Sequence, residues 1–180
     1  MKFQELAEKR QSCRAYKDIP VEREKLQACI EAARLSPSAC NSQPWSFVVV
    51  DEPETAKQIF PALLDGVLPI NRFTRNCNAF IIVVEESAGL SSKLGGRFKD
   101  QNFALIDIGI AVQTICLAAA EQGIGTCIMG WFDEKKLKGL TGIPKSKRIR
   151  LVIAAGYPET EGLRPKIRKP IEEILHFNQW

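Results

Sequence analysis

Short apolar runs mark the strands that this sequence predicts. Residues 47–50 and 79–84 are continuous stretches of valine, isoleucine, phenylalanine and alanine. Such runs are typical of strands that are buried on both faces of a sheet. Residues 126–129 and 150–155 have a similar character. The sequence therefore predicts a sheet of four or five strands.

Apolar residues spaced by three or four positions predict the helices. They cover residues 2–10, 21–35, 55–64 and 102–122. The last segment is rich in alanine and apolar nearly all round, so we expect a central buried helix that ends at Gly123. Helices combined with a mixed or antiparallel sheet define an α+β layered fold, and we expect residues 1–180 to form one domain.

Composition limits the classes of function. The chain has 180 residues, 45% of them hydrophobic and 26% charged, as in ordinary globular domains. Its net charge of +4 is small and dispersed, which argues against a nucleic-acid partner. The first residues lack a secretion signal, and the longest apolar runs are too short to span a bilayer. We therefore expect a cytoplasmic protein without a membrane partner.

Cysteine spacing gives no sign of a metal centre. None of the six cysteines forms a Cys-x-x-Cys pair, and the single histidine, His176, has no cysteine near it in sequence. Zinc and iron–sulfur sites need such clusters, so we expect no metal. Cys29 and Cys116 fall inside helical apolar patterns and are expected to be buried thiols.

Two basic clusters are candidates for binding an anion. Residues two apart in an extended segment share a face, so Arg10, Ser12 and Arg14 can point the same way. Lys166 and Arg168 repeat this spacing near the other end of the chain. Guanidinium groups and a hydroxyl suit a terminal phosphate. A charged surface exposed to solvent is the alternative for each cluster.

A loop of small and amide residues precedes the first predicted strand. In residues 36–45, small side chains would let a flat ring approach the backbone. Asn41 and Gln43 supply both donors and acceptors, as the edge of a flavin or a pyrimidine requires. An ordinary connection between a helix and a strand is the alternative.

These segments together resemble the nitroreductase family of FMN-dependent enzymes, in particular its shorter members. The resemblance begins with Arg-x-Ser-x-Arg-x-Tyr at 10–16 and Pro-Ser-x-x-Asn-x-Gln-Pro-Trp at 37–45. It continues through residues 107–111, 119–126 and 156–158 and closes at Lys166-Ile167-Arg168. Ordered segments that span nearly the whole chain are far more specific than any one of them.

The resemblance implies a homodimer with an FMN site across each subunit interface. One subunit would bind the cofactor through Arg10, Gln11, Ser12, Arg14, Asn71, Met129, Gly130, Lys166 and Arg168, and the other through Pro37, Ser38, Ala39 and Asn41. Trp131 would line the substrate pocket, although an interface or core position is an equal alternative. No residue is assigned as catalytic, because the flavin carries the chemistry. Residues 163–180, which are poorly suited to packing on their own subunit, would form an arm that wraps the partner.

The activity implied is a ping-pong hydride transfer. NADH or NADPH would reduce the flavin at N5, and a nitroaromatic, a quinone or a similar small acceptor would then be reduced. A flavin carrier or sensor without turnover is one alternative, and dehalogenation or ring fragmentation on the same fold is another. A Rossmann enzyme is disfavoured, because residues 123–128 follow a predicted helix and lack the third glycine.

Overall fold

A four-stranded antiparallel sheet forms the centre of the molecule. The computed structural model describes residues 2–64, 70–87 and 101–180. The strands are β1 (Trp45–Val50), β2 (Ala79–Glu85), β3 (Gly125–Met129) and β4 (Arg148–Gly156), in the order β1-β2-β4-β3. Every pair of neighbours is antiparallel. The predicted α+β fold is confirmed, with β4 inserted between two strands that precede it in sequence.

The central strand β2 is buried on both faces. Phe80, Ile82 and Val84 enter one hydrophobic core. Ala79, Ile81 and Val83 alternate with them and enter a second core on the opposite face. Successive side chains of a strand point to opposite faces, so a strand covered on both sides must be apolar throughout. This explains the continuous apolar run in the sequence.

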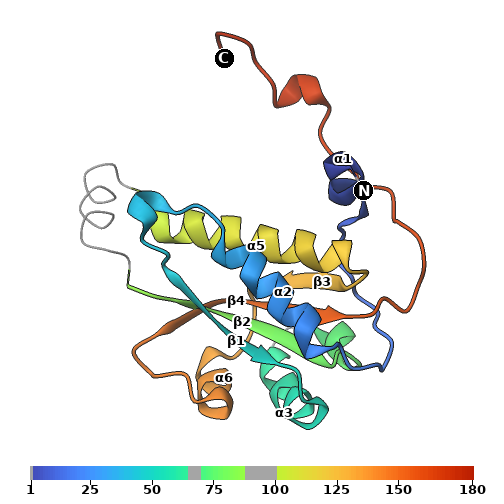
Figure 1. Cartoon of the computed structure of the whole chain (residues 1–180), viewed down its shortest axis with the longest axis vertical. Helices are drawn as coiled ribbons and strands as arrows, with labels where there is room; N and C mark the ends of the chain where they lie inside the picture. Colours follow the sequence, from blue (N-terminus) through green and yellow to red (C-terminus); the bar gives the residue numbers. More distant parts are fainter. Residues whose placement is uncertain (1, 65–69, 88–100) are drawn as a thin grey trace.

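Helices cover both faces of the sheet (Figure 1). On one face lie α2 (Arg23–Arg34) and α5 (Phe103–Glu121), and on the other lie α3 (Pro53–Leu63) and α6 (Glu134–Thr141). Helix α1 (Phe3–Lys9) contacts α5, and short 3-10 turns occupy η1 (Ala39–Asn41), η2 (Arg72–Thr74) and η3 (Ile171–Glu173). Cys29 on α2 and Cys116 on α5 are buried free thiols, as expected.

Helix α5 is central, but only one side of it is buried. Ile108, Val112 and Ile115 belong to the core between α5 and the sheet. Leu105, Ile106 and Ile110 are exposed, which corrects the expectation of a helix buried all round. Within the described ranges, α5 alone has the length and hydropathy of a membrane span, and half of that window is buried inside the chain. Its apolar character therefore reflects a core helix with an additional apolar surface.

The segment that follows α1 lies along the edge of β3. Ser12 pairs with Thr126 in a parallel bridge, and the N–H of Cys13 donates to the carbonyl of Thr126 at 2.8 Å. Gly125 lies opposite Gly156 in the β3–β4 register. A Cβ at Gly125 would lie 2.7 Å from the Cβ of Cys13, so only glycine allows this close approach.

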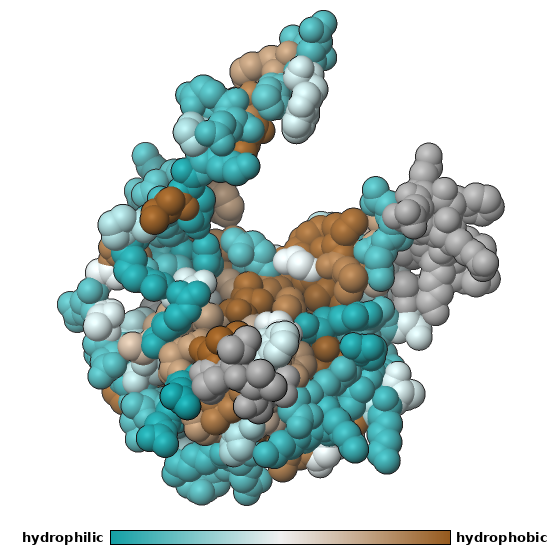
Figure 2. Space-filling model, turned by 180° about the vertical axis from the view of Figure 1, so that it is seen from behind, coloured by the Kyte–Doolittle hydropathy of each residue, from teal (hydrophilic) through white to brown (hydrophobic). Residues whose placement is uncertain are grey.

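Residues 163–180 form an arm that leaves the body of the protein. Figure 1 shows this arm passing α1 and extending beyond the helical layers. Its side chains are exposed apart from the half-buried Lys166, and they include Ile167 (91% exposed) and Phe177. Figure 2 shows a hollow between the arm and the body, with hydrophobic surface on its floor. The arm thus presents apolar side chains that its own subunit leaves uncovered.

Candidate functional site

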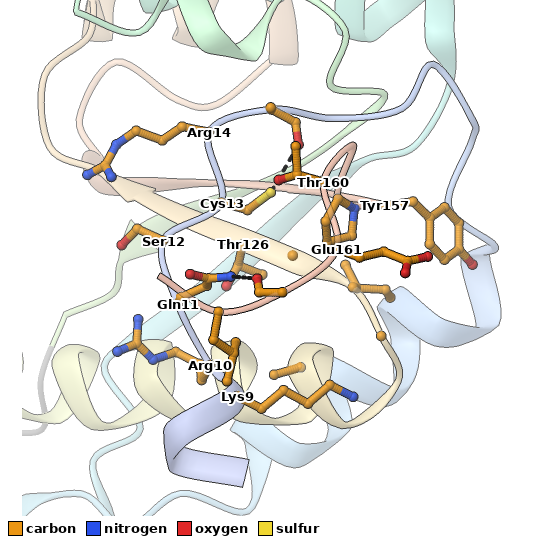
Figure 3. A pocket seen from close by; sticks show the side chains of 18 of the residues that line it. Lys9, Arg10, Gln11, Ser12, Cys13, Arg14, Thr126, Tyr157, Thr160 and Glu161 are labelled. Atoms are coloured by element: carbon orange, nitrogen blue, oxygen red, sulfur yellow. Dashed lines mark hydrogen bonds between the residues drawn. The ribbon is translucent and has the colours of Figure 1, made fainter. Parts of the chain in front are cut away.

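The segment after α1 presents its two arginines to one side. In Figure 3 the side chains of Arg10, Ser12 and Arg14 point the same way, as the alternation predicts. Gln11 and Cys13 point to the opposite side. The alternation follows from the extended backbone, which begins where α1 ends and is fixed by the bridge between Ser12 and Thr126.

Gln11 ties this segment to the start of the arm. Its Nε2 donates to the carbonyl of Gly162 at 3.0 Å, and its Oε1 accepts the backbone N–H of Arg164 at 3.2 Å. The guanidinium of Arg164 also donates to the carbonyl of Ser12. Segments about 150 positions apart in sequence are therefore held together, and in this structure the Gln11 amide serves that contact.

Lys166 connects the arm to the end of α1. Its Nζ donates to the carbonyls of Ala7 at 2.7 Å and Arg10 at 2.6 Å. The last carbonyls of a helix lack intrahelical partners and attract cations. This local preference places Lys166 beside Arg10. The two basic clusters, which the sequence places at opposite ends of the chain, converge here.

The converging cations repel one another and keep a hydrogen-bond donor without a partner among the described residues, so they could bind an anion. Burial, followed by repulsion from Arg10 and Arg168, lowers the pKa of Lys166. The charge of Glu8 acts in the opposite direction and less strongly. The Nε of Arg10 is buried and has no hydrogen-bond partner among the residues described. An anion with several acceptor oxygens, such as a phosphate monoester, would satisfy that donor and relieve the repulsion.

A pocket of about 600 Å³ lies next to this segment. Its lining combines the segment, the turn after α5 and the residues after β4, including Tyr157 and Glu161. In Figure 3, Arg10, Ser12 and Arg14 point away from these two residues. Lys9 and Arg164 also line the pocket, so cations lie on both sides of the segment.

The small-residue loop lies elsewhere in the chain. Pro37, Ser38, Ala39 and Asn41 are exposed or half-buried, and η1 contacts α5. Figure 1 places this loop near the N-terminal end of α5 and α1 near its C-terminal end. Within one chain the loop and the cationic cluster are thus two separate groups, each a candidate half-site.

Asn71 and the residues after β3 form a third group. Asn71 is 4% exposed, and its Nδ2 donates to the carbonyls of Leu63 at 3.0 Å and Trp131 at 2.7 Å. A ring contact by Asn71 would therefore depend on its Oδ1. Gly130 and Trp131 are exposed, whereas the side chain of Met129 belongs to the core and could meet a ligand only through its backbone.

Ile128 is a surface residue that sequence reasoning missed. It is 42% exposed on β3, between the buried Cys127 and Met129. Successive side chains of a strand point to opposite faces, so a buried Met129 would have predicted that Ile128 is exposed. Arg164 is a second such residue, because its contact to Ser12 depends on folding and not on local sequence.

The structure thus combines an α+β layered fold with a cluster of cationic side chains at the end of α1. The family model described as "Nitroreductase family" matches residues 7–157. The chain belongs to this family. The resemblance seen in the ordered motifs is thereby confirmed.

Related proteins support an oxidoreductase. A protein of Archaeoglobus fulgidus, provisionally named an NADH dehydrogenase/NAD(P)H nitroreductase, is 34% identical over 157 residues, which cover 84% of this chain and 83% of that protein. The oxygen-insensitive NADPH nitroreductase of Helicobacter pylori strain J99 is 27% identical and covers 96% of this chain and 95% of its own length.

The structure of an FMN-dependent nitroreductase of Clostridium difficile R20291 is also similar. It superposes with a TM-score of 0.75 at 26% identity, and the match covers 97% of this chain and 98% of that one. Family, relatives and fold agree, and the protein is an oxidoreductase.

Proposed function

We propose that the protein is an FMN-dependent NAD(P)H oxidoreductase that reduces a small acceptor such as a nitroaromatic or a quinone. The observation that carries this proposal is the convergence of Arg10, Lys166 and Arg168, with the Nε of Arg10 buried and without a partner among the described residues. Similarity to an FMN-dependent nitroreductase and to an NADPH nitroreductase supports the choice of cofactor and reductant.

The cationic cluster would hold the phosphate of the cofactor. Arg10 offers a guanidinium fork, and Ser12 offers a hydroxyl on the same side of the segment. Lys166 keeps its two bonds to the end of α1 and has a third donor to offer, since an ammonium group has three. When bound, FMN would supply the hydride chemistry that the side chains lack.

Trp131 and Gly130 would lie on the substrate side. Both are exposed after β3, and the bond from Asn71 fixes the backbone of Trp131. A planar indole that is 47% exposed can contact a flat acceptor or the nicotinamide. Its position would help to exclude water from one side of the site.

A second copy of the chain would complete each site. Pro37, Ser38, Ala39 and Asn41 would reach the flavin of the other subunit, and residues 163–180 would wrap around it. The exposed Leu105, Ile106 and Ile110 on α5 and the apolar side chains of the arm supply surface for such an interface. In this arrangement the cationic cluster and the small-residue loop of each chain would both contact a flavin.

Spectroscopy and titration test the proposal. Purified protein should show the visible absorption of oxidised flavin, and the flavin-free form should bind FMN more tightly than riboflavin, which lacks the phosphate. Anaerobic addition of NADH or NADPH should bleach that absorption, and menadione should restore it. Equal affinity for FMN and riboflavin would contradict the phosphate site. A flavin-loaded protein that neither nicotinamide reduces would instead be a carrier.

A further inference from the structure

The small-residue loop is held in an unfavourable backbone conformation. Cys40, Asn41 and Gln43 have φ values of 52°, 51° and 45°, in the left-handed region. Residues with a Cβ avoid this region, asparagine less strongly than the others. Three such residues within four positions persist only where the surroundings determine the conformation, and such strain concentrates at functional sites.

Two contacts anchor this loop to α5. The hydroxyl of Ser36 donates to the Oγ1 of Thr114 at 3.1 Å, and the backbone N–H of Ala39 donates to the Oδ2 of Asp107 at 3.1 Å. Asp107 and Thr114 are two helical turns apart and share one face of α5. Residues 36–39 therefore run along α5 between two fixed points, immediately before the left-handed residues.

Further bonds close the loop on itself. The N–H of Gln43 donates to the Oγ of Ser38 at 2.9 Å, and the Nε2 of Gln43 donates to the carbonyl of Asn41 at 3.3 Å. The Oγ of Ser42 is buried and has no partner in the part of the chain that the structure describes. The loop is thus fixed in shape while one of its polar atoms remains unsatisfied.

Asp107 is an unusual residue to find beneath this loop. It is 4% exposed, and its carboxylate takes part in no ion pair among the described residues. A buried carboxylate without a cation is destabilising unless hydrogen bonds compensate for its lost hydration. Its bond to the N–H of Ala39 is charge-assisted, and such bonds are stronger than neutral ones.

We propose that Asp107 is a positioning residue for the flavin site of the partner subunit. Its carboxylate fixes the backbone of Ala39 and thereby the left-handed turn that presents Ser38 and Asn41 to the neighbouring cofactor. This inference rests on the proposed function, because it requires that the loop meets a flavin. Asp107 would not contact the cofactor itself, but it would determine the geometry of the site across the interface.

Substitutions at Asp107 separate positioning from general stability. Asp107→Ala should weaken FMN binding by about tenfold or more, the effect of losing one charge-assisted hydrogen bond. Asp107→Asn keeps an acceptor oxygen and should stay within about threefold of the original protein. Gln122→Ala is the matched control, because Gln122 directly follows α5 and donates to the backbone of Lys25 on α2. It should lower the melting temperature and leave the FMN dissociation constant unchanged.

A mixed dimer tests whether Asp107 acts across the interface. One subunit carries Asp107→Ala and the other Arg10→Ala, with two different tags for purification. If the loop acts on the partner's cofactor, one site combines an intact Arg10 with an intact loop, and the mixed dimer should bind one FMN with the original affinity. If the loop acts within its own subunit, each site has one defect and neither should bind normally.

Each result has a definite meaning. Restored binding in the mixed dimer supports the inference, and absent restoration overturns it. Asp107→Ala with unchanged affinity overturns it as well, while Arg10→Ala losing FMN would leave the proposed function standing. If the original protein shows no preference for FMN over riboflavin, the proposed function itself fails.

Discussion

Arg10 is the side chain on which the proposed phosphate site depends most. Its Nε is buried without a partner among the described residues, and it adds to the repulsion that lowers the pKa of Lys166. Sequence alternation predicted that Arg10, Ser12 and Arg14 share a side. No local pattern could predict that Lys166 binds the carbonyls of Ala7 and Arg10, since that contact joins residues more than 150 positions apart.

Replacing Arg10 should weaken cofactor binding. We expect Arg10→Ala to reduce the free energy of FMN binding by about 1.5–3 kcal/mol, the range for a hydrogen bond to a charged group. Riboflavin should bind both proteins equally, because it lacks the phosphate. Fluorescence titration of the flavin-free protein measures both affinities.

Lys9→Ala is the matched control for Arg10→Ala. Lys9 is also cationic and lies one position earlier, but its side chain points to the other side of the segment (Figure 3). Equal losses from the two substitutions would mean that general positive charge, and not the guanidinium of Arg10, holds the cofactor.

At the scale of elements, the strands were predicted well and one helix was not. The apolar runs at 47–50 and 79–84 fell within β1 and β2. Burial on both faces is confirmed for the central strand β2 and was wrong for β1, which lies at the edge of the sheet and is half-buried over residues 46–49. Helix α6 was not predicted, because it is short and Leu137 is its one buried residue, which is too few to form a recognisable apolar pattern. The order β1-β2-β4-β3 depends on long-range pairing, which local patterns do not encode.

The glycine at the start of β3 makes room for the segment that carries Arg10. A Cβ at Gly125 would lie 2.7 Å from the Cβ of Cys13 and 2.8 Å from its Sγ. Gly125→Ala should therefore destabilise the fold by about 1–3 kcal/mol through overpacking. Gly139→Ala, on α6 with nothing within 4 Å, should stabilise it by about 0.5–1 kcal/mol.

Urea unfolding curves compare these two glycine variants. Cofactor binding should suffer only in Gly125→Ala, since its clash displaces the segment next to Ser12. A Gly125→Ala protein as stable as the original would show that β3 and the segment do not need their close contact.

A hydrogen-bonded group connects α2 to the residue after β4. Tyr157 donates to Glu22, Lys25 donates to Tyr157 at 2.6 Å, and Lys25 pairs with Glu22 at 3.0 Å. The hydrogen bond from Tyr157, with further contributions from the backbone and Lys25, lowers the pKa of Glu22 from 4.5 to about 2. Because the pKa is lowered on folding, the stabilisation from Glu22 is complete above pH 4.5 and is lost as the pH falls towards 2.

Acid unfolding should reveal this group. The melting temperature of the original protein should fall more steeply between pH 4.5 and 2 than that of Glu22→Gln, and added salt should reduce the difference because the pair is exposed. Calorimetry across this pH range measures both slopes. Glu24→Gln removes the same charge two positions later, in the first turn of α2, without removing a bond to Tyr157, and it should keep the original slope.

At the scale of the whole molecule, the arm is the feature that a single chain leaves unexplained. Apolar side chains such as Ile174, Phe177 and Trp180 are exposed along it. Its wrapping of a second subunit remains a prediction, which the exposed apolar surface of α5 supports.

Removing residues 170–180 should weaken the dimer and retain the cationic cluster, since Lys166 and Arg168 stay in place. Sedimentation velocity should show a larger monomer fraction, and circular dichroism should show unchanged secondary structure. The milder variant Ile174→Ser with Phe177→Ser should shift the equilibrium in the same direction. A truncated protein that dimerises as tightly as the original would rule out the wrapping arm.

The meeting of Arg10 with Lys166 has a consequence for unfolding. These residues are 156 positions apart, so a ligand that binds both acts as a non-covalent cross-link around a very long loop. Unlike a disulfide it would not restrict the denatured chain, because it binds only the folded state, and its stabilisation would grow with the logarithm of the free ligand concentration. Limited proteolysis should therefore begin at residues 2–17 and 163–180 in the flavin-free protein, and saturating FMN should protect both segments together.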